Sequence, residues 1–269
     1  MCKVLEVSPS GFYSWVNRSK TKREKYQEIL LTIIVEVYND SYGEYGAPRI
    51  TEELNERGYV CCENTVAKLM KANNICAKPR KKFVHTTDSN HGFKVFPNVI
   101  NRDFSAEKPN QKWVSDITYV WAAGKWHYLC AIIDLYSRMV ISWTFKDHMR
   151  SEMVIEAFEK AVKKRNPKPG LIFHSDRGIQ YACNEFRETL EKYGVTQSMS
   201  RKGNCWDNSP AESFFGTIKT ARINKVFYET YEDAKLDIFE YIEGFYNTRR
   251  KHSSIGYLSP MKYEEKKVG

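Results

Sequence analysis

Residues 112–145, KWVSDITYVWAAGKWHYLCAIIDLYSRMVISWTF, carry the pattern on which the class of fold depends. The first ten alternate as a β-strand does, with Val114, Asp116 and Thr118 on one face. The short segments AAGK and YSR separate this strand from two further runs of strand-forming residues. The stretch therefore predicts three strands in a meander, with a carboxylate inside the first of them.

The residues that follow alternate between helix and strand. Residues 151–165 and 183–194 have apolar side chains at helical spacing, and the second pattern ends at a glycine. LIFHSD at 171–176 and VTQSMS at 195–200 predict strands, and a further helix opens at Ser209. A meander followed by helix, strand, helix, strand and helix predicts an α/β fold. We expect a mixed five-stranded sheet with helices on its faces.

The N-terminal part of the chain predicts only helices. A short helix begins after Ser8, which can cap it, and a longer helix is expected over residues 26–38. PRITEELNERG and NTVAKLMKAN predict two short helices joined by a tight glycine turn, the pattern of a helix-turn-helix. Residues 64–87 hold six bases and no acid, which favours DNA contact over a solvated basic face of a small helical bundle. These bases are Lys68, Lys71, Lys78, Arg80, Lys81 and Lys82.

Composition restricts the classes of protein to which the chain can belong. Its 269 residues are 42% hydrophobic, enough for a packed core, but no apolar run approaches the ~18 residues of a membrane span. The start of the chain lacks the apolar centre of a secretion signal, and the seven cysteines include no Cys-x-x-Cys pair. The net charge of +9 favours nucleic acid as partner. We therefore expect a cytoplasmic protein with no membrane association.

Three acids stand at positions that the predicted fold can bring together. Asp116 lies within the first strand, Asp176 ends the fourth, and Glu212 lies in the first turn of the helix after the fifth. In a right-handed crossover, strands one and four can be neighbours. Two unit charges ~4 Å apart repel by about 4 kcal/mol at an effective dielectric near 20, and divalent cations remove that repulsion. Oxygen ligands of this kind suit two Mg²⁺ ions, for which Mn²⁺ can substitute.

Each acid also has a structural interpretation that the residues leave open. Asp176 is followed at once by Arg177 and Gly178, and a lone acid beside a turn is commonly a satisfied structural group. The SPAE segment can form a capping box, with Ser209 as the cap and Glu212 three residues later. Replacing Glu212 by Gln separates the two roles, because Gln retains much of a capping box and lacks the charge that a metal requires.

The spacing of the acids resembles that of DDE transposases and retroviral integrases, which share an RNase H-like fold. Thirty-five residues separate Asp176 from Glu212, and Lys219 follows Glu212 by seven, on the same helix face. The wider chain resembles second-frame (OrfB-type) transposases of insertion sequences in the IS3 group. The segments that carry this resemblance are YGAPRITEELNERGYVCCENTVAKLMKANNI, WVSDITYV, YLCAIIDLYSRMVISW, HSDRGIQY, NCWDNSPAESFFGTIK and FYNTRRKHSSIGYLSP.

The resemblance implies an RNase H-like integrase core with Asp116, Asp176 and Glu212 as the catalytic and metal-binding triad and Lys219 in contact with DNA. The expected divisions of the chain are a helical segment, a helix-turn-helix domain, a linker, the core, and a helical extension of the core. Their boundaries are expected at 1–25, 26–85, 86–105, 106–222 and 223–269. Further DNA contacts are expected from Arg49, Lys68, Lys71, Arg249 and Arg250.

The activity implied is metal-dependent cleavage at the ends of an insertion sequence, followed by transfer of the freed 3′-OH into DNA. The partners implied are the terminal inverted repeats, the target DNA, further copies of the chain, and the first-frame (OrfA-type) protein as a partner or fused N-terminal part. The expected location is the bacterial cytoplasm, associated with the nucleoid. Two other functions stay open: a DNA-binding regulator with an inactive core, and a nuclease that cuts without joining.

Three further residues have interpretations of their own. Asp207, beside Asn208, is interpreted as shaping the loop before the last core helix. His174, two residues before Asp176, either orients the site or is a packed strand histidine. Asp134 ends the second predicted strand, but its spacing does not match that of a metal ligand.

Overall fold

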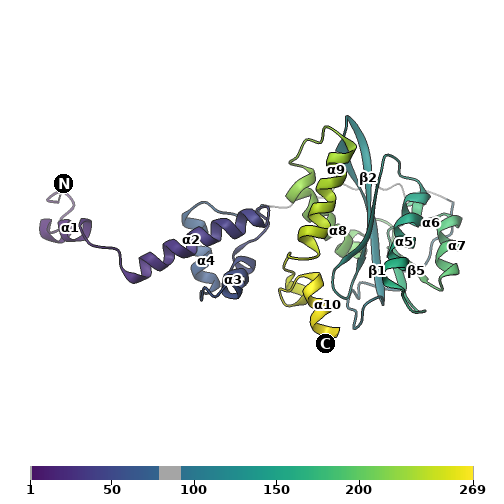
Figure 1. The fold of residues 1–269 in the computed structure, drawn as a ribbon, viewed down its shortest axis with the longest axis horizontal. Helices are drawn as coiled ribbons and strands as arrows, with labels where there is room; N and C mark the ends of the chain where they lie inside the picture. Colours follow the sequence, from purple (N-terminus) through teal and green to yellow (C-terminus); the bar gives the residue numbers. More distant parts are fainter. Residues whose placement is uncertain (1, 79–91, 269) are drawn as a thin grey trace. The chain divides into compact units, whose positions relative to one another are not determined.

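The computed structural model describes residues 2–78 and 92–268. The chain divides into two compact units, residues 1–77 and 78–269 (Figure 1). The boundary expected between residues 85 and 86, and the bases Arg80, Lys81 and Lys82, lie outside the described residues.

The first unit contains only helices among its described residues. They are α1 (Pro9–Val16), α2 (Lys22–Asp40), α3 (Ala47–Glu56) and α4 (Glu63–Ala72). Ser8 caps α1 as expected, and Gly58 ends the turn after α3 with a φ of +86°, a conformation that favours glycine. Buried apolar side chains from α2, α3 and α4 form one small core: Leu30, Ile34, Ile50, Leu54, Val66 and Met70. The helix-turn-helix pattern is therefore present.

The second unit is built on a five-stranded sheet with the order β3-β2-β1-β4-β5. Its strands are β1 (Lys112–Ala122), β2 (Lys125–Asp134), β3 (Val140–Lys146), β4 (Ile172–Ser175) and β5 (Thr196–Met199). The first three are antiparallel, whereas β4 runs parallel to β1 and β5 parallel to β4. This confirms the mixed sheet, and it confirms that strands one and four are neighbours.

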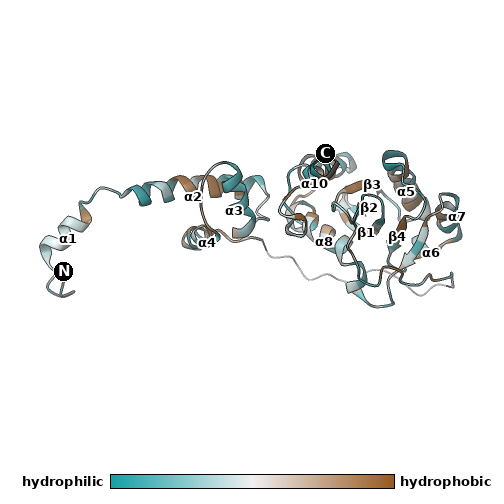
Figure 2. Cartoon of the chain, turned by 90° about the horizontal axis from the view of Figure 1, so that it is seen from below, coloured by the Kyte–Doolittle hydropathy of each residue, from teal (hydrophilic) through white to brown (hydrophobic). Residues whose placement is uncertain are grey.

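Helices cover both faces of this sheet. Figure 2 shows α5 (Ser151–Arg165), α6 (Ile179–Ala182) and α7 (Asn184–Lys192) on one side of the strands. On the other side lie α8 (Ser209–Ile218) and α10 (Pro260–Val268). The helix α8 continues into η2 (Lys219–Ile223), and α9 (Tyr231–Phe239) continues into η3 (Glu240–Tyr246). Short turns of 3₁₀-helix, η1 (Cys205–Asn208) and η4 (Ser253–Ile255), complete the second unit.

The alternation of β1 explains why the sheet is covered twice. Trp113 points toward α5, where its ring lies 6.2 Å from the ring of Phe158, and Phe158 lies 5.6 Å from Phe173. The opposite face of β1, which carries Asp116 and Val120, is also buried. Truncating Phe158 to alanine would destabilise the unit by about 3–5 kcal/mol, because the cavity would lie at the centre of the aromatic cluster.

Within the described residues, no helix is long and apolar enough to cross a membrane.

Candidate active site

The register of the sheet brings Asp116 and Asp176 together. Val114 of β1 pairs with His174 of β4, and this is the last pair between the two strands. Asp116 follows Val114 by two residues and Asp176 follows His174 by two, so each acid projects from the same face of the sheet as its member of that pair. Adjacent strands lie about 4.8 Å apart, which makes these two acids neighbours.

The start of α8 is tied to the same place on β1. Asn208, at the N-cap of α8, donates a hydrogen bond from Nδ2 to the carbonyl oxygen of Ser115, at 3.1 Å. Ser115 is the residue before Asp116, and Glu212 lies one helical turn beyond Asn208. This hydrogen bond therefore places the first turn of α8 beside Asp116.

The electrostatics of Asp116 follow from this arrangement. Its side chain is buried at 8% exposure, and Oδ1 accepts a hydrogen bond from the N–H of Ile117 at 2.8 Å. Burial raises the pKa of Asp116 well above its ordinary value, and the negative charges of Asp176 and Glu212 raise it further. Lys219 opposes this shift, while burial lowers the pKa of Lys219 itself. The four side chains thus share one electrostatic environment.

A turn fixes Asp176 at the end of β4. Its Oδ1 accepts a hydrogen bond from the N–H of Gly178 at 2.9 Å, and Arg177 donates from Nε to the carbonyl oxygen of Ser200 at 2.7 Å. Asp176, Arg177 and Gly178 therefore form one turn that is held by hydrogen bonds. The structural interpretation of Asp176 is compatible with a role in a site, because the turn holds the carboxylate next to Asp116.

The capping box expected for Glu212 does not form. Ser209 is already helical, the N-cap position belongs to Asn208, and no side chain caps this N-terminus. The interpretation of Ser209 as a cap was wrong because η1 leads directly into α8, which shifts the helix start by one residue. Glu212 is thus not held by the local motif that the sequence suggested.

The donor chemistry of the site fits a divalent cation, although the side chains do not form a ready coordination shell. Among the described residues, no group of three or more His, Cys, Asp or Glu side chains is placed to hold a metal ion. Burial, and then the charge of Asp176, nevertheless raise the pKa of Asp116, so the charged form of this carboxyl would be favoured by a cation bound beside it. Carboxylate oxygens in such a place suit Mg²⁺ or Mn²⁺.

The bases expected to contact DNA in the first unit lie at or near its surface. Lys68 and Lys71 are exposed on α4. Arg49 on α3 is half-buried, with its guanidinium 5.7 Å from the centre of the Tyr45 ring. In the second unit, Arg249 is exposed and donates from Nε to the carbonyl oxygen of Gly244.

Arg250 lies in the interior instead. It is 3% exposed, its guanidinium lies 5.6 Å from the centre of the Tyr246 ring, and it faces the ring of His252. Lys251 is also buried. The chain turns inward after η3, so this run of bases does not form a continuous surface, and burial argues against Arg250 as a DNA contact.

His174 is a packed strand histidine whose hydrogen bonds define its tautomer. Its Nε2 lies 2.9 Å from the carbonyl oxygen of Asp207, and because a carbonyl only accepts, Nε2 carries the proton. Nδ1 then accepts from the hydroxyl of Ser198 at 2.8 Å. Burial lowers the pKa of His174 to about 4, so the ring is neutral at pH 7.

Two residues near Asp207 were not found from the sequence. Asn98 and Arg102, in the segment interpreted as a linker, donate hydrogen bonds to the carboxylate of Asp207 at 3.0 and 2.9 Å. No local pattern in that segment points to them, because their partner lies more than a hundred residues away along the chain.

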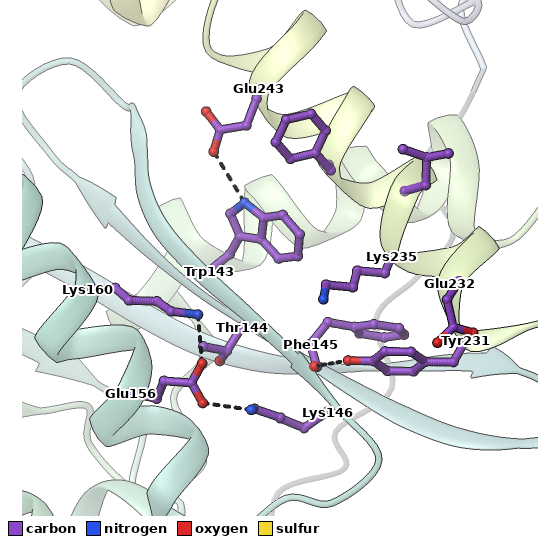
Figure 3. A pocket seen from close by; sticks show the side chains of 12 residues that line it. Trp143, Thr144, Phe145, Lys146, Glu156, Lys160, Tyr231, Glu232, Lys235 and Glu243 are labelled. Carbon is purple, nitrogen blue, oxygen red and sulfur yellow. Dashed lines mark hydrogen bonds and ion pairs between the residues drawn. The ribbon is translucent and has the colours of Figure 1, made fainter.

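A pocket of about 540 Å³ lies elsewhere in the second unit, between β3, α5, α9 and η3 (Figure 3). Its side chains pair with one another: Trp143 donates to Glu243, and Lys160 to Glu156. None of the expected site residues lines it. The acids of the candidate site are therefore separate from this pocket.

Known families match both units of the chain. An HTH-like domain matches residues 25–83, and two families described as integrase core domains match residues 106–205 and 193–260. Among curated proteins, the chain is 39% identical to an uncharacterised 31 kDa protein of insertion element IS600 from Shigella sonnei, over 99% of this chain and 98% of that protein. It is 36% identical to transposase InsF for insertion sequence IS3A from Escherichia coli, over 100% of this chain and 94% of that protein.

Among solved structures, the chain is similar to a simian T-cell lymphotropic virus intasome in complex with PP2A regulatory subunit B56 gamma. That match has 14% identity and a TM-score of 0.47, over 86% of this chain and 73% of that one. The catalytic domain of Mos1 mariner transposase matches with 15% identity and a TM-score of 0.44, over 51% of this chain and 71% of that one.

Proposed function

Since the chain belongs to the family of IS3-type insertion-sequence transposases, which act in DNA transposition and integration, we propose that Asp116, Asp176 and Glu212 form its catalytic site. The reaction proposed is cleavage of a phosphodiester at the end of the element by water, which frees a 3′-OH. That 3′-OH then attacks a phosphodiester of the target DNA and displaces a 3′-oxygen there. No covalent bond between protein and DNA is required.

The three carboxylates would hold divalent cations, two Mg²⁺ ions with Mn²⁺ as a substitute. Bound there, such cations supply neutralisation of the carboxylates and of the phosphodiester, together with activation of the attacking oxygen. The chain contributes the alignment: the N–H groups of Ile117 and Gly178 hold Asp116 and Asp176 in place, and α8 brings in Glu212. This role accounts for a buried carboxyl, Asp116, whose pKa is raised by burial and by the charges of Asp176 and Glu212.

DNA contacts would come from both units. Lys68 and Lys71 on α4, with Arg49 on α3, are suited to phosphates at the terminal inverted repeats. Lys219, which feels the charge of Asp116, would contact the DNA end near the reacting phosphodiester. Arg249 is a further candidate, whereas the buried Arg250 is omitted.

The assembly proposed contains further copies of the chain on DNA, with the first-frame protein as a partner or as a fused N-terminal part. Its place of action would be the bacterial cytoplasm, at the nucleoid. Membership of the family supports this part of the proposal.

The observation that carries the proposal is the burial of Asp116 beside Asp176 and Glu212, whose negative charges raise its pKa. The test uses labelled element ends and target DNA with Mg²⁺, comparing wild type with Asp176→Asn and Glu212→Gln. Both variants should lose cleavage and joining, while Glu191→Gln, an exposed acid on α7, should behave as wild type. Activity that survives both changes would refute the catalytic site.

The same assay separates the two other functions. A nuclease would cut the labelled ends without producing joined products. A DNA-binding regulator would bind the ends equally well with and without Asp176→Asn, and would cut none of them.

A further inference from the structure

Asp207 has an unusually complete set of hydrogen-bond donors for a buried carboxylate. Its side chain is fully buried, yet it accepts from Arg201 through the backbone N–H, Nε and one terminal nitrogen, at 3.0, 2.8 and 2.8 Å. Arg102 and Asn98 add two more donors, at 2.9 and 3.0 Å. A carboxylate has about four lone-pair sites, so its capacity is filled. This acid connects the loop after β5 to the segment that contains residues 98–102.

The backbone of Asp207 is fixed as well. Its carbonyl oxygen accepts the Nε2–H of His174 on β4, the strand that ends at Asp176. His174 in turn accepts from Ser198 on β5, whose hydroxyl oxygen also accepts the N–H of Val99. Side chain and main chain thus connect Asp207 to β4, β5 and residues 98–102 at once.

Asn208 extends the connection to β1. Its side chain is 3% exposed and donates to the carbonyl oxygen of Ser115, beside Asp116. Two consecutive residues therefore attach the start of α8 to both strands that carry the catalytic aspartates. Glu212 follows Asn208 by four residues, about 6 Å along the helix.

The start of α8 has no local side-chain cap that could hold it in place. No side chain caps it, in contrast to α9, where Thr230 and Asp233 form a capping box. An uncapped helix start has unsatisfied backbone donors and frays more readily. The tertiary contacts of Asp207 and Asn208 therefore add to the packing of α8 on the sheet in fixing where its first turn lies.

We propose that Asp207 is a positioning residue for the reaction: it fixes the carboxylate of Glu212 opposite Asp116 and Asp176, and Arg102 and Asn98 form part of the same fixture. This inference rests on the proposed function, because it requires Glu212 to be a metal ligand. A displacement of about 1 Å in such a site can reduce the rate by about 10²-fold. The segment that contains Asn98 and Arg102 precedes the core in the sequence, and these two side chains bind Asp207, the acid that positions Glu212.

The rival interpretation is that Asp207 only stabilises the fold, and two pairs of variants separate the interpretations. Asp207→Asn removes the charge and retains the shape, while Asp134→Asn does the same to another fully buried acid, paired with Arg165 at 3.1 Å. Arg102→Ala removes a half-exposed donor that the core does not need for packing, and Arg187→Ala on α7 is its surface control. Arg102→Ala keeps the test decisive if Asp207→Asn does not fold.

Each full-length variant is titrated with Mn²⁺, and two quantities are recorded: the rise in melting temperature that Mn²⁺ produces, and the rate of end cleavage. For Asp207→Asn we expect the Mn²⁺ concentration at half-saturation to increase, and cleavage at saturating Mn²⁺ to fall by about 10–100-fold, as for residues that orient metal ligands. Arg102→Ala should change both in the same direction by a smaller factor, and Arg102→Lys should restore part of the loss. Affinity for the element ends should not change.

The controls give each outcome a meaning. Asp134→Asn should lower the melting temperature without altering the Mn²⁺ concentration at half-saturation, and Arg187→Ala should alter neither. If Asp176→Asn abolishes cleavage while Asp207→Asn and Arg102→Ala retain the wild-type Mn²⁺ dependence, the positioning role is refuted and the proposed function stands. If Asp176→Asn cleaves as wild type does, the proposed function is refuted and this inference with it.

Discussion

Asp116 and Asp207 are both buried in the second unit, on the same side of the sheet, and their surroundings are opposite. Asp207 receives hydrogen bonds from two arginines, and the contact with Arg201, followed by that with Arg102, holds the pKa of Asp207 well below its usual range. Asp116 has two acids and one partly buried lysine around it, and burial together with Asp176 raises the pKa of Asp116. The surroundings of Asp207 favour its charged form, whereas the surroundings of Asp116 favour its neutral form.

This contrast separates acids that maintain a structure from acids for which we propose a chemical role. A buried carboxylate with matched donors is stable without a ligand. A buried carboxylate beside other carboxylates makes the folded state less stable, and groups of this kind concentrate at functional sites. Asp134 belongs with Asp207, because it accepts from Arg165 and from the N–H groups of Asn110 and Tyr136.

The largest effect is expected from Asp116→Asn. Cleavage of element ends should fall on the order of 10³-fold, as when a preorganised charge is removed from an active site. Without metal, the melting temperature should stay the same or increase, because the substitution removes a carboxyl whose charged form is disfavoured by burial and by the neighbouring acids. Five of the six tryptophans lie in the second unit, so fluorescence follows its unfolding. A marked drop in melting temperature would place Asp116 with the structural acids and remove the contrast.

Asp207→Asn should lower the stability of the folded protein, in contrast to Asp116→Asn. Removing one partner of a buried ion pair leaves arginines without their acceptor and typically costs about 3–5 kcal/mol. Arg201 and Arg102 are half-exposed and can be solvated, so we expect about 2–3 kcal/mol here. For a unit of this size that is a decrease of about 5–10 °C in melting temperature. Thermal unfolding monitored by fluorescence measures it, and an unchanged value would show that the arginines contribute nothing to stability.

The difference in melting temperature between wild type and Asp207→Asn should depend on pH. Contacts with Arg201 lower the pKa of Asp207 in the folded state below its unfolded value of about 3.9. A group with a lowered pKa contributes stability above the unfolded pKa and loses it as pH falls through the folded pKa. The melting temperatures of wild type and Asp207→Asn should therefore differ fully at pH 5 and above, and converge below about pH 4. A difference that stays constant down to about pH 2 would mean that the charge of Asp207 is not what stabilises the loop.

The sequence alone predicted the arrangement of strands well, and the reason is local. The alternation around Asp116 and the turns after Trp121 and Leu135 are encoded in neighbouring residues. The structure has β1, β2 and β3 in the three segments that these turns separate. Right-handed crossover connections allow β1 and β4 to be neighbours, and the structure confirms that they are. The approach of the three acids was an inference from that topology.

What the sequence could not provide depends on distant partners. Asn98 and Arg102 bind an acid that follows them by more than a hundred residues, and nothing in their own segment marks them. The capping box at Ser209 was wrong because the preceding turn η1 shifts the helix start, an effect of tertiary contacts on a local motif. Arg250 was placed at the surface because a run of bases usually lies there, yet its guanidinium packs on Tyr246.

The smallest effect is expected from Glu156→Gln on α5, an acid that is paired without being buried. Glu156 contacts Lys146 and Lys160, each at 2.7 Å, beside the pocket in Figure 3, and its side chain is 38% exposed. Exposed pairs of this kind contribute about 0.2–1 kcal/mol, because water solvates both partners once they separate. Urea denaturation should therefore show a change of about 0.5 kcal/mol or less, several times smaller than for Asp207→Asn. A loss of stability as large as that of Asp207→Asn would mean that an ion pair stabilises the fold equally well whether or not it is buried. The contrast between Asp116 and Asp207 would then depend on their partners alone.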